Sequence, residues 1–172
     1  MDIINKPRIS KSISRTYTGL AVFIACLALI FAYLAFFTPA GLIMLGASFV
    51  LLVLIEPLFL MVLRSLHNTR YILSDNELVI DTSVLIGGSK IIQLDTIETL
   101  EKTLYPFGFK LFGASFHGGY YSIPGLGRAF IAVTNLDDGI LVRTTQRNYI
   151  ISPRDPMDFI ETFKSRVVQV KK

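Results

Sequence analysis

Two long apolar runs constrain the fold of this chain more than any other feature of its sequence. Residues 19–37 carry no charged side chain, and residues 42–63 carry only Glu56. Each run has the length of about 20 residues that an α-helix needs to cross the hydrocarbon core of a bilayer. Because only residues 38–41 separate the runs, we expect residues 19–63 to form a two-helix transmembrane hairpin.

The flanking charges predict the orientation of this hairpin. The loop between the runs is uncharged, whereas basic side chains precede the first run and follow the second. Since positive charge is retained on the cytoplasmic side, both ends should lie in the cytoplasm, with the chain in the cell (inner) membrane. These basic residues are Lys6, Arg8, Lys11 and Arg15 before the hairpin, and Arg64 and Arg70 after it, with His67 beside them.

A cleaved signal peptide is the alternative reading of the first run, because Thr38 and Ala40 have the small-x-small spacing of a cleavage site. The run is longer than the usual signal core of about 7–15 residues, and a second run follows at once, so a retained hairpin is favoured. The expected organisation is a basic cytoplasmic arm at 1–18, the hairpin at 19–63, a juxtamembrane linker at 64–69 and a cytoplasmic domain at 70–172.

The net charge of +4 does not indicate a nucleic-acid-binding protein. Much of the excess lies in the N-terminal arm, where it suits the anionic inner leaflet of a membrane. The only cysteine, Cys26, lies within the first apolar run, so one chain has neither a disulfide framework nor a cysteine-based metal site.

The apolar runs contain two features of their own. Five alanines recur at steps of three and four and form a small-residue stripe, which lets transmembrane helices approach closely. The stripe packs either on the second helix of the same chain or on another chain. Glu56, followed by Pro57, is an intramembrane carboxylate and is interpreted as an assembly residue, with a proton or ion path as the alternative. The stripe consists of Ala21, Ala25, Ala28, Ala32 and Ala35.

The rest of the chain has the pattern of short strands followed by one helix. Residues 70–81 alternate on either side of "SDN" and predict a hairpin. Further strands are expected at "KIIQLDTIETL", "RAFIAVTN", "GILVRTT" and "NYIIS". Asp155 as N-cap and Pro156 at the first helical position predict a terminal helix. Its apolar stripe would contain Phe159, Ile160, Phe163 and Val167.

This pattern resembles the bacterial pleckstrin-homology-like domains of small membrane proteins. The resemblance covers residues 70–167 and rests on "YSIPGLGRAFIAVTN" and "YIISPRDPMDFIETF". It implies a mainly-β, strongly bent barrel of about seven antiparallel strands capped by one C-terminal helix, behind two transmembrane helices. It implies no catalytic residue and no cofactor. The residues matching the family pattern are Gly125, Gly127, Arg128, Thr134, Ser152, Pro153, Asp155, Pro156 and Phe159.

Specific phosphoinositide binding is not expected. Related lipid-binding domains hold phosphates with closely spaced basic residues in the first hairpin, whereas this hairpin carries Asp75, Glu77 and Asp81. No phosphate loop, zinc-protease motif or nucleophile elbow is present, and we expect no catalytic, cofactor-binding or metal site.

The segment "FGASFHGGYYSIPGLGRAF" is rich in glycine and aromatic residues. We expect its glycines to turn the chain, with a type II turn at Pro124 and Gly125. Its aromatic residues either belong to the core or form an exposed rim that contacts a protein or lipid headgroups. The candidate interface is Phe116, Tyr120, Tyr121, Lys110 and Arg128.

The predicted function is that of a membrane-anchored interaction or scaffold protein that binds a protein partner or its own copy. The alternative is an accessory or regulatory subunit of a membrane transport system, with Glu56 in the interface. Membrane-embedded hydrolysis that uses Glu56 is the third reading.

Overall fold

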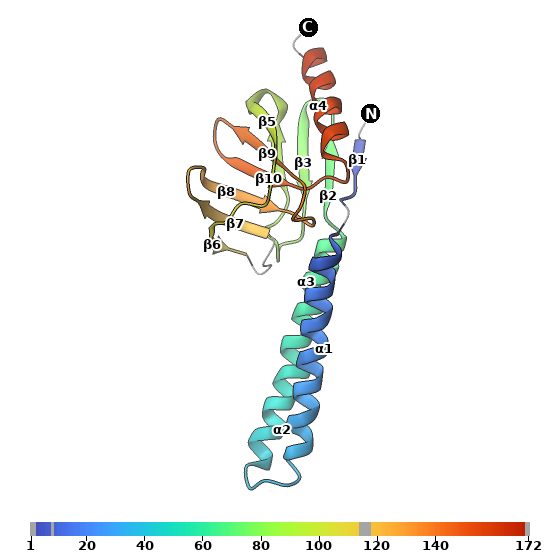
Figure 1. Ribbon diagram of the computed structural model, residues 1–172, viewed down its shortest axis with the longest axis vertical. Coiled ribbons are helices and arrows are strands. Elements are labelled where there is room, and N and C mark those ends of the chain that lie inside the picture. The colour runs from blue at the N-terminus through green and yellow to red at the C-terminus, as the bar shows by residue number, and fades with distance from the viewer. Residues whose placement is uncertain (1–2, 8, 114–117, 171–172) are drawn as a thin grey trace. The chain divides into compact units, whose positions relative to one another are not determined.

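The computed structural model describes residues 3–7, 9–113 and 118–170, with side chains as far as Arg166. The chain divides into a helical unit, Lys11–Arg64, and a β-rich unit formed by Met1–Ser10 and Ser65–Lys172. The helical unit is therefore inserted into the sequence of the β-rich unit (Figure 1).

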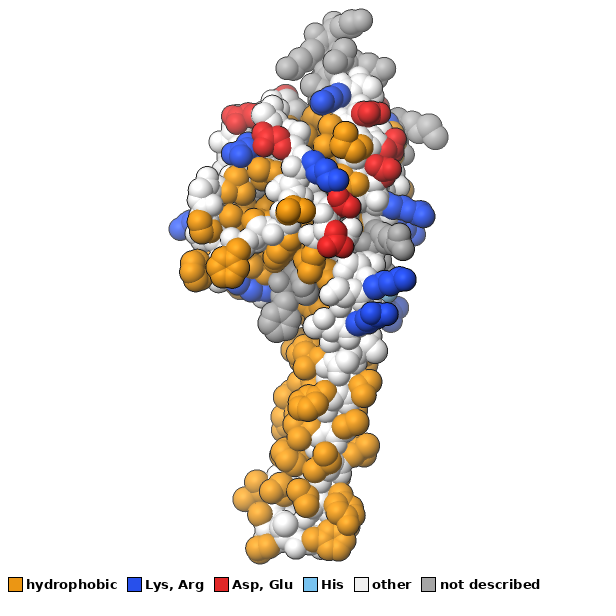
Figure 2. Space-filling model, in the orientation of Figure 1, with side chains coloured by type: hydrophobic (Ala, Val, Ile, Leu, Met, Phe, Trp, Pro, Cys, Tyr) orange, Lys and Arg blue, Asp and Glu red, His pale blue; other side chains and the backbone are white. Residues whose placement is uncertain are grey.

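The helical unit contains α1 (Lys11–Leu34) and a second helical segment. The second segment runs through α2 (Gly41–Val50), a short π-helical stretch η1 (Leu51–Ile55) and α3 (Glu56–His67). Both helices are long and apolar enough to cross a membrane, as judged by length and composition. Their surface is covered largely by hydrophobic side chains (Figure 2).

The π-helical stretch lies directly before Pro57. The Glu56 N–H donates to the carbonyl of Leu51, five residues back, instead of four. Proline has no N–H to donate, and its ring crowds the preceding turn, so a locally wider turn accommodates it within a continuous helix. Glu56 therefore lies where the helix changes from π to α geometry.

Helix α1 packs against α2 and η1. Ala21 and Ala28 of the alanine stripe are buried, and Ala25, Ala32 and Ala35 are partly buried. The small residues thus lie where close helix contact within one chain needs them.

The first sheet of the β-rich unit has the strand order β1-β2-β3-β4. Its strands are β1 (Ile3–Asn5), β2 (Arg70–Leu73), β3 (Glu77–Asp81) and β4 (Lys90–Gln93). All neighbouring pairs are antiparallel. The hairpin expected at residues 70–81 is confirmed, with a hydrogen bond from the Ser74 N–H to the Glu77 carbonyl closing its turn.

The N-terminal segment is part of this sheet. Ile3 pairs with Leu73, and Asn5 pairs with Tyr71. The Asn5 side chain accepts the Arg154 N–H at 3.0 Å, and the Ser10 N–H donates to the Thr134 carbonyl at 2.7 Å. The structure thus divides the chain at Lys11, whereas the sequence suggested a separate arm extending to residue 18.

The second sheet has the strand order β5-β9-β10-β8-β7-β6. Strands β8 and β10 run parallel, and the other neighbours run antiparallel. The strands are β5 (Ile97–Thr103), β6 (Phe109–Phe112), β7 (Gly118–Ile123), β8 (Gly127–Ala132), β9 (Gly139–Thr144) and β10 (Asn148–Ile151).

The fold class expected from sequence is confirmed, and its details differ in two ways. The described residues form ten strands in two sheets, including one parallel pair, instead of about seven antiparallel strands. The strand expected at residues 90–100 is broken by the 3₁₀ turn η2 (Leu94–Thr96), where Leu94 is buried and its N–H donates to the Asn76 carbonyl. The chain passes from one sheet to the other at this turn.

Helix α4 (Pro156–Val170) closes the fold. Its expected N-cap is confirmed, because the Asp155 carboxylate accepts the N–H groups of Met157 and Asp158, each at 3.1 Å. Phe159, Ile160 and Phe163 are buried in a core with side chains from both sheets, as their helical spacing predicted. The side chain of Val167 lies outside the described part.

The six-stranded sheet has apolar side chains on both faces. One face contributes to the core beneath α4, through residues such as Phe130 and Ile151. The opposite face forms a second buried cluster, which includes Tyr121 and Ile131 and is covered in part by Tyr105, Leu126 and Leu136. Because side chains alternate along a strand, adjacent residues enter different clusters.

A buried hydrogen-bonded junction joins three strand ends. The Tyr71 hydroxyl donates to the Ala132 carbonyl at 2.5 Å and accepts the Ser152 N–H at 3.2 Å. The Ser152 hydroxyl accepts the Thr134 N–H at 2.8 Å. Burial raises the pKa of Tyr71 to about 12, and its hydrogen bonds with Ser152 oppose this shift. The phenol therefore stays protonated and keeps its donor.

Replacing Tyr71 with Phe tests this junction. The Ala132 carbonyl and the Ser152 N–H would lose a buried partner, so the free energy of unfolding should fall by about 1–3 kcal/mol. Denaturant unfolding of the full-length protein in detergent, followed by near-UV circular dichroism, measures the change. Tyr120→Phe is the matched control, since no described residue forms a hydrogen bond with the Tyr120 hydroxyl.

The same measurement has a pH dependence. The unfolded phenol ionises near 10.0 and the folded one near 12, so the contribution of Tyr71 is complete below pH 10 and is lost as the pH rises toward 12. In the Tyr71→Phe variant, the free energy of unfolding should no longer show the fall between pH 10 and 12 that Tyr71 causes. An unchanged stability, or an unchanged pH profile, would contradict the role of this hydroxyl.

Candidate interaction surface

Basic and aromatic side chains from four segments meet at one place in the β-rich unit, here called the basic–aromatic cluster. It consists of Lys90 on β4, Tyr120 on β7, Phe130 on β8, Arg147 directly before β10 and Tyr149 on β10. The Lys90 ammonium lies 5.6 Å from the ring centre of Tyr120 and 5.1 Å from that of Phe130. The Arg147 guanidinium lies 5.0 Å from the Tyr120 ring centre.

The rings of the cluster support one another. Phe130 is fully buried and makes edge-to-face contacts with Tyr120 at 5.2 Å and with Tyr149 at 6.3 Å. Burial raises the pKa of Tyr149, and the neighbouring charge of Arg147 opposes this shift. Both tyrosines are partly exposed.

The cations of the cluster have no carboxylate partner within ion-pair distance among the described residues. Lys90 donates to the Gly87 carbonyl at 2.8 Å, which still leaves two of its three N–H donors. Two cations beside two phenols can bind an anionic group by charge-assisted hydrogen bonds, or an aromatic side chain by stacking.

A second surface feature is the apolar strip, which consists of Leu104, Phe107, Phe109, Leu111 and Phe112. Phe107 is 83% exposed, and Phe109 and Phe112 are each 69% exposed. Strand β6, which carries three of these residues, is the last strand of its sheet. The space-filling view shows large hydrophobic side chains on this part of the β-rich unit (Figure 2).

A β-bulge determines how the strip is presented. Phe109 pairs with Ser122 and Phe112 pairs with Tyr120, with a register shift between Lys110 and Phe112. The extra residue puts Phe109 and Phe112 on the same face, although simple alternation would put them on opposite faces. Gly119 allows the close approach of β7 at this point, since its φ is +111° and a Cβ there would clash with the Phe112 carbonyl oxygen.

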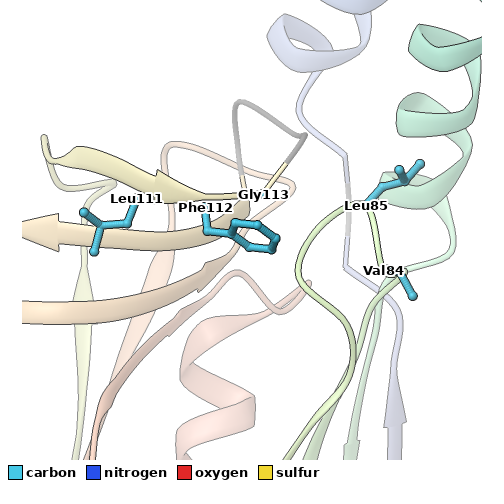
Figure 3. Close-up of a pocket in the computed structure, with 5 residues that line it drawn as sticks. All are labelled: Val84, Leu85, Leu111, Phe112 and Gly113. Carbon is cyan, nitrogen blue, oxygen red and sulfur yellow. The ribbon is translucent and has the colours of Figure 1, made fainter.

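A groove of about 470 Å³ adjoins one end of the strip. Its lining comes from Leu111, Phe112 and Gly113 at the end of β6 and from Val84 and Leu85 in the loop between β3 and β4. Phe112 points toward this loop (Figure 3). None of the lining residues that the structure describes is charged.

The structure separates the interface residues expected from sequence. Tyr121 is only 5% exposed and belongs to the second buried cluster, so this residue is corrected from interface to core. Tyr120 is partly buried in the basic–aromatic cluster, and Arg128 is exposed. The Lys110 ammonium folds over the Tyr121 ring at 5.6 Å and donates to the Gly118 carbonyl at 3.3 Å. Phe116 lies outside the described residues.

Two groupings were missed by sequence reasoning. Lys90 and Arg147 are far apart in the chain, and no sequence pattern indicated that they share the Tyr120 ring. No sequence signal identified the bulge that brings Phe109 and Phe112 to one face. No group of three or more metal-binding side chains occurs in the part of the chain that the structure describes.

Comparison with known protein families identifies the β-rich unit. The family model described as "Bacterial PH domain" matches residues 69–167, more than half of the chain. The chain belongs to the bacterial PH domain family. No curated protein and no solved structure matches it.

Membership in this family accounts for the motif residues as elements of structure. In the bacterial PH domain, Ser152 and Thr134 form the buried junction with Tyr71, and Asp155 caps α4. The expected type II turn is confirmed, because Gly125 has a φ of +77° and the Leu126 N–H donates to the Ile123 carbonyl at 3.1 Å. Gly118 and Gly119, by contrast, lie in β7 instead of forming a turn.

The bacterial PH domain has an acidic first hairpin, as its sequence indicated. Asp75 in the β2–β3 turn forms an ion pair with Arg166 of α4 at 2.8 Å. PH-like domains are generally non-catalytic, and the family points to an interaction or scaffold role.

Substitution of the two adjacent tyrosines by serine tests the assignment of core and surface. Tyr121→Ser should lower the free energy of unfolding by about 3–5 kcal/mol, the usual cost of truncating a buried aromatic side chain. Tyr120→Ser should cost about half as much, since its ring remains partly exposed. Thermal unfolding of the two full-length variants in the same detergent provides the comparison, and equal losses would contradict the assignment.

Proposed function

We propose that this protein is a non-catalytic, membrane-anchored interaction protein of the cell membrane, whose cytoplasmic bacterial PH domain binds a protein partner or a second copy of the chain. The observation that carries this proposal is the basic–aromatic cluster, displayed on an interaction fold that is attached to two helices of membrane-spanning length.

The pairing of β1 with β2 supports the anchoring. Residues before α1 and residues after α3 lie in adjacent strands of one sheet, so both ends of the helical segment reach the same domain. Two membrane crossings would return the chain to the side from which it started, as this pairing requires. The basic residues on both flanks also favour one side, the cytoplasm, for both ends. Cleavage after the first helix would remove β1 from its sheet, which favours a retained hairpin over a signal peptide.

The basic–aromatic cluster supports a partner with an acidic surface. Lys90 and Arg147 present positive charge beside phenol hydroxyls, and aromatic and arginine side chains are common anchors at protein interfaces. A carboxylate of the partner could bridge the two cations while an apolar group stacks on Tyr120.

Charge removal at the cluster tests this function. The Lys90→Gln/Arg147→Gln variant should lose its partner or its self-association, with at least about a tenfold reduction in recovered complex, because buried charged contacts are worth about 2–5 kcal/mol. Cross-linking in native membranes followed by mass spectrometry measures the recovery.

The matched control is Arg154→Gln/Lys164→Gln, which removes the same charge from exposed positions outside the cluster. It should retain the complex. Equal recovery from both double variants would contradict the cluster as the binding surface.

A second candidate function is an accessory subunit of a membrane transport system, and the position of Glu56 favours it. The carboxylate lies at the change from π to α geometry beside Pro57, and π-helical turns occur frequently at functional sites. A carboxylate in an apolar helix can serve assembly by a hydrogen bond to another helix.

Two substitutions at Glu56 distinguish assembly from proton transfer. Glu56→Gln should keep complexes intact because the amide still forms hydrogen bonds, whereas Glu56→Leu should weaken them by about 0.6–2 kcal/mol. Blue-native electrophoresis of membranes extracted in mild detergent measures assembly. If the Glu56→Leu complexes stay intact, Glu56 has no role in assembly. If the Glu56→Gln complexes stay intact but lose transport activity, proton transfer is favoured.

A further inference from the structure

We propose that the apolar strip docks on the surface of the same bilayer that holds the two helices, so that the bacterial PH domain contacts lipid through Phe107, Phe109 and Phe112. This inference rests on the membrane anchoring proposed above and is independent of the partner bound by the basic–aromatic cluster.

The composition of the strip fits the interfacial region of a membrane. Phenylalanine and leucine side chains can bury apolar area at the boundary between the headgroups and the acyl chains. Residues 104–113 contain Lys110 but no acidic residue, so nothing in this segment opposes an anionic leaflet. Arg128 is a second exposed cation near the strip. It pairs with Ser122 on β7, and Ser122 pairs with Phe109 on β6.

The opposite edge of the same sheet provides an internal comparison. Strand β5 carries Glu98, Glu101 and Lys102 on its exposed positions, and Lys102 forms an ion pair with Asp138 at 2.7 Å. Charged side chains of this kind keep an edge strand soluble and prevent unwanted pairing. Strand β6 has only Lys110, which folds back over Tyr121, so its edge presents mainly apolar side chains.

The connections to the helices are short enough to hold the domain at the membrane surface. Only Asn68 and Thr69 lie between the end of α3 and the start of β2, and two extended residues span at most about 7 Å. Residues 6–10 form a second connection, between β1 and α1. Such tethering makes docking an intramolecular event, for which a few apolar side chains are sufficient.

The absence of tryptophan from the natural sequence allows a direct test. A single Phe109→Trp substitution places the only indole on the strip, and Ile91→Trp places it on β4, the edge of the other sheet. The two positions are matched, with exposures of 69% and 63%. Each full-length variant is reconstituted in nanodiscs of phosphatidylcholine and phosphatidylglycerol, with either ordinary or brominated acyl chains.

Brominated lipid should quench the Phe109→Trp emission at least about twofold more than the Ile91→Trp emission, because apolar rings docked on a membrane enter the boundary between headgroups and acyl chains, close to the bromine atoms. Phe107→Trp should behave like Phe109→Trp and serves as the second reporter if one variant does not fold. Circular dichroism in the discs verifies that each variant retains the fold.

Equal quenching at the strip and at Ile91 would overturn the inference while leaving the anchoring intact. A strip emission that changes only when two copies share a disc would also overturn it, because the strip would then bind a second copy. Failure of the wild-type chain to enter the discs would overturn the anchoring, and this inference with it.

Discussion

The pairing of β1 with β2 is the contact on which the arrangement of this chain depends. It joins residues that are separated by the whole helical segment, with Asn5 opposite Tyr71. Tyr71 in turn bonds Ala132 and Ser152, so the strand that leaves the helices is tied directly into the centre of the domain. Arg154 and Thr134 hold the entering strand through hydrogen bonds to Asn5 and Ser10. Both connections between the helices and the domain are therefore fixed at their domain ends.

The six-stranded sheet explains why an apolar strip remains at the surface. Both faces of this sheet are apolar, and helix α4 covers only one of them. The other face is covered by irregular segments that contribute Tyr105, Leu126 and Leu136. Strand β6 lies at the end of the sheet, where its bulge places Phe109 and Phe112 on the same face as Tyr120, and neither ring belongs to the core beneath α4. Exposing apolar area of this kind to water is unfavourable in free energy, and contact with a bilayer or a partner would bury it.

The two surfaces of the bacterial PH domain differ in their chemistry. The basic–aromatic cluster combines cations that have no carboxylate within ion-pair distance in the described structure with rings supported by buried Phe130, and it suits a specific charged partner. The strip is largely uncharged and suits a fluid apolar surface that requires no precise geometry. Burial lowers the pKa of Lys110, the one cation within the strip's own strand. A domain with both surfaces could hold a partner close to the membrane.

The sequence by itself determined the features that depend on local chemistry. Apolar length predicted both long helices, Asp155 and Pro156 predicted the start of α4, and Pro124 with Gly125 predicted a type II turn, because each signal lies within a few consecutive residues. Tertiary structure decided the pairing of β1 with β2, the parallel pair of β8 and β10, and the break between β4 and β5. It also decided that Tyr121 enters the core while Tyr120 meets Lys90 and Arg147. Alternation shows that adjacent side chains face opposite ways, but which face is covered depends on strands and helices distant in the chain, whose pairing leaves no periodic trace in the sequence.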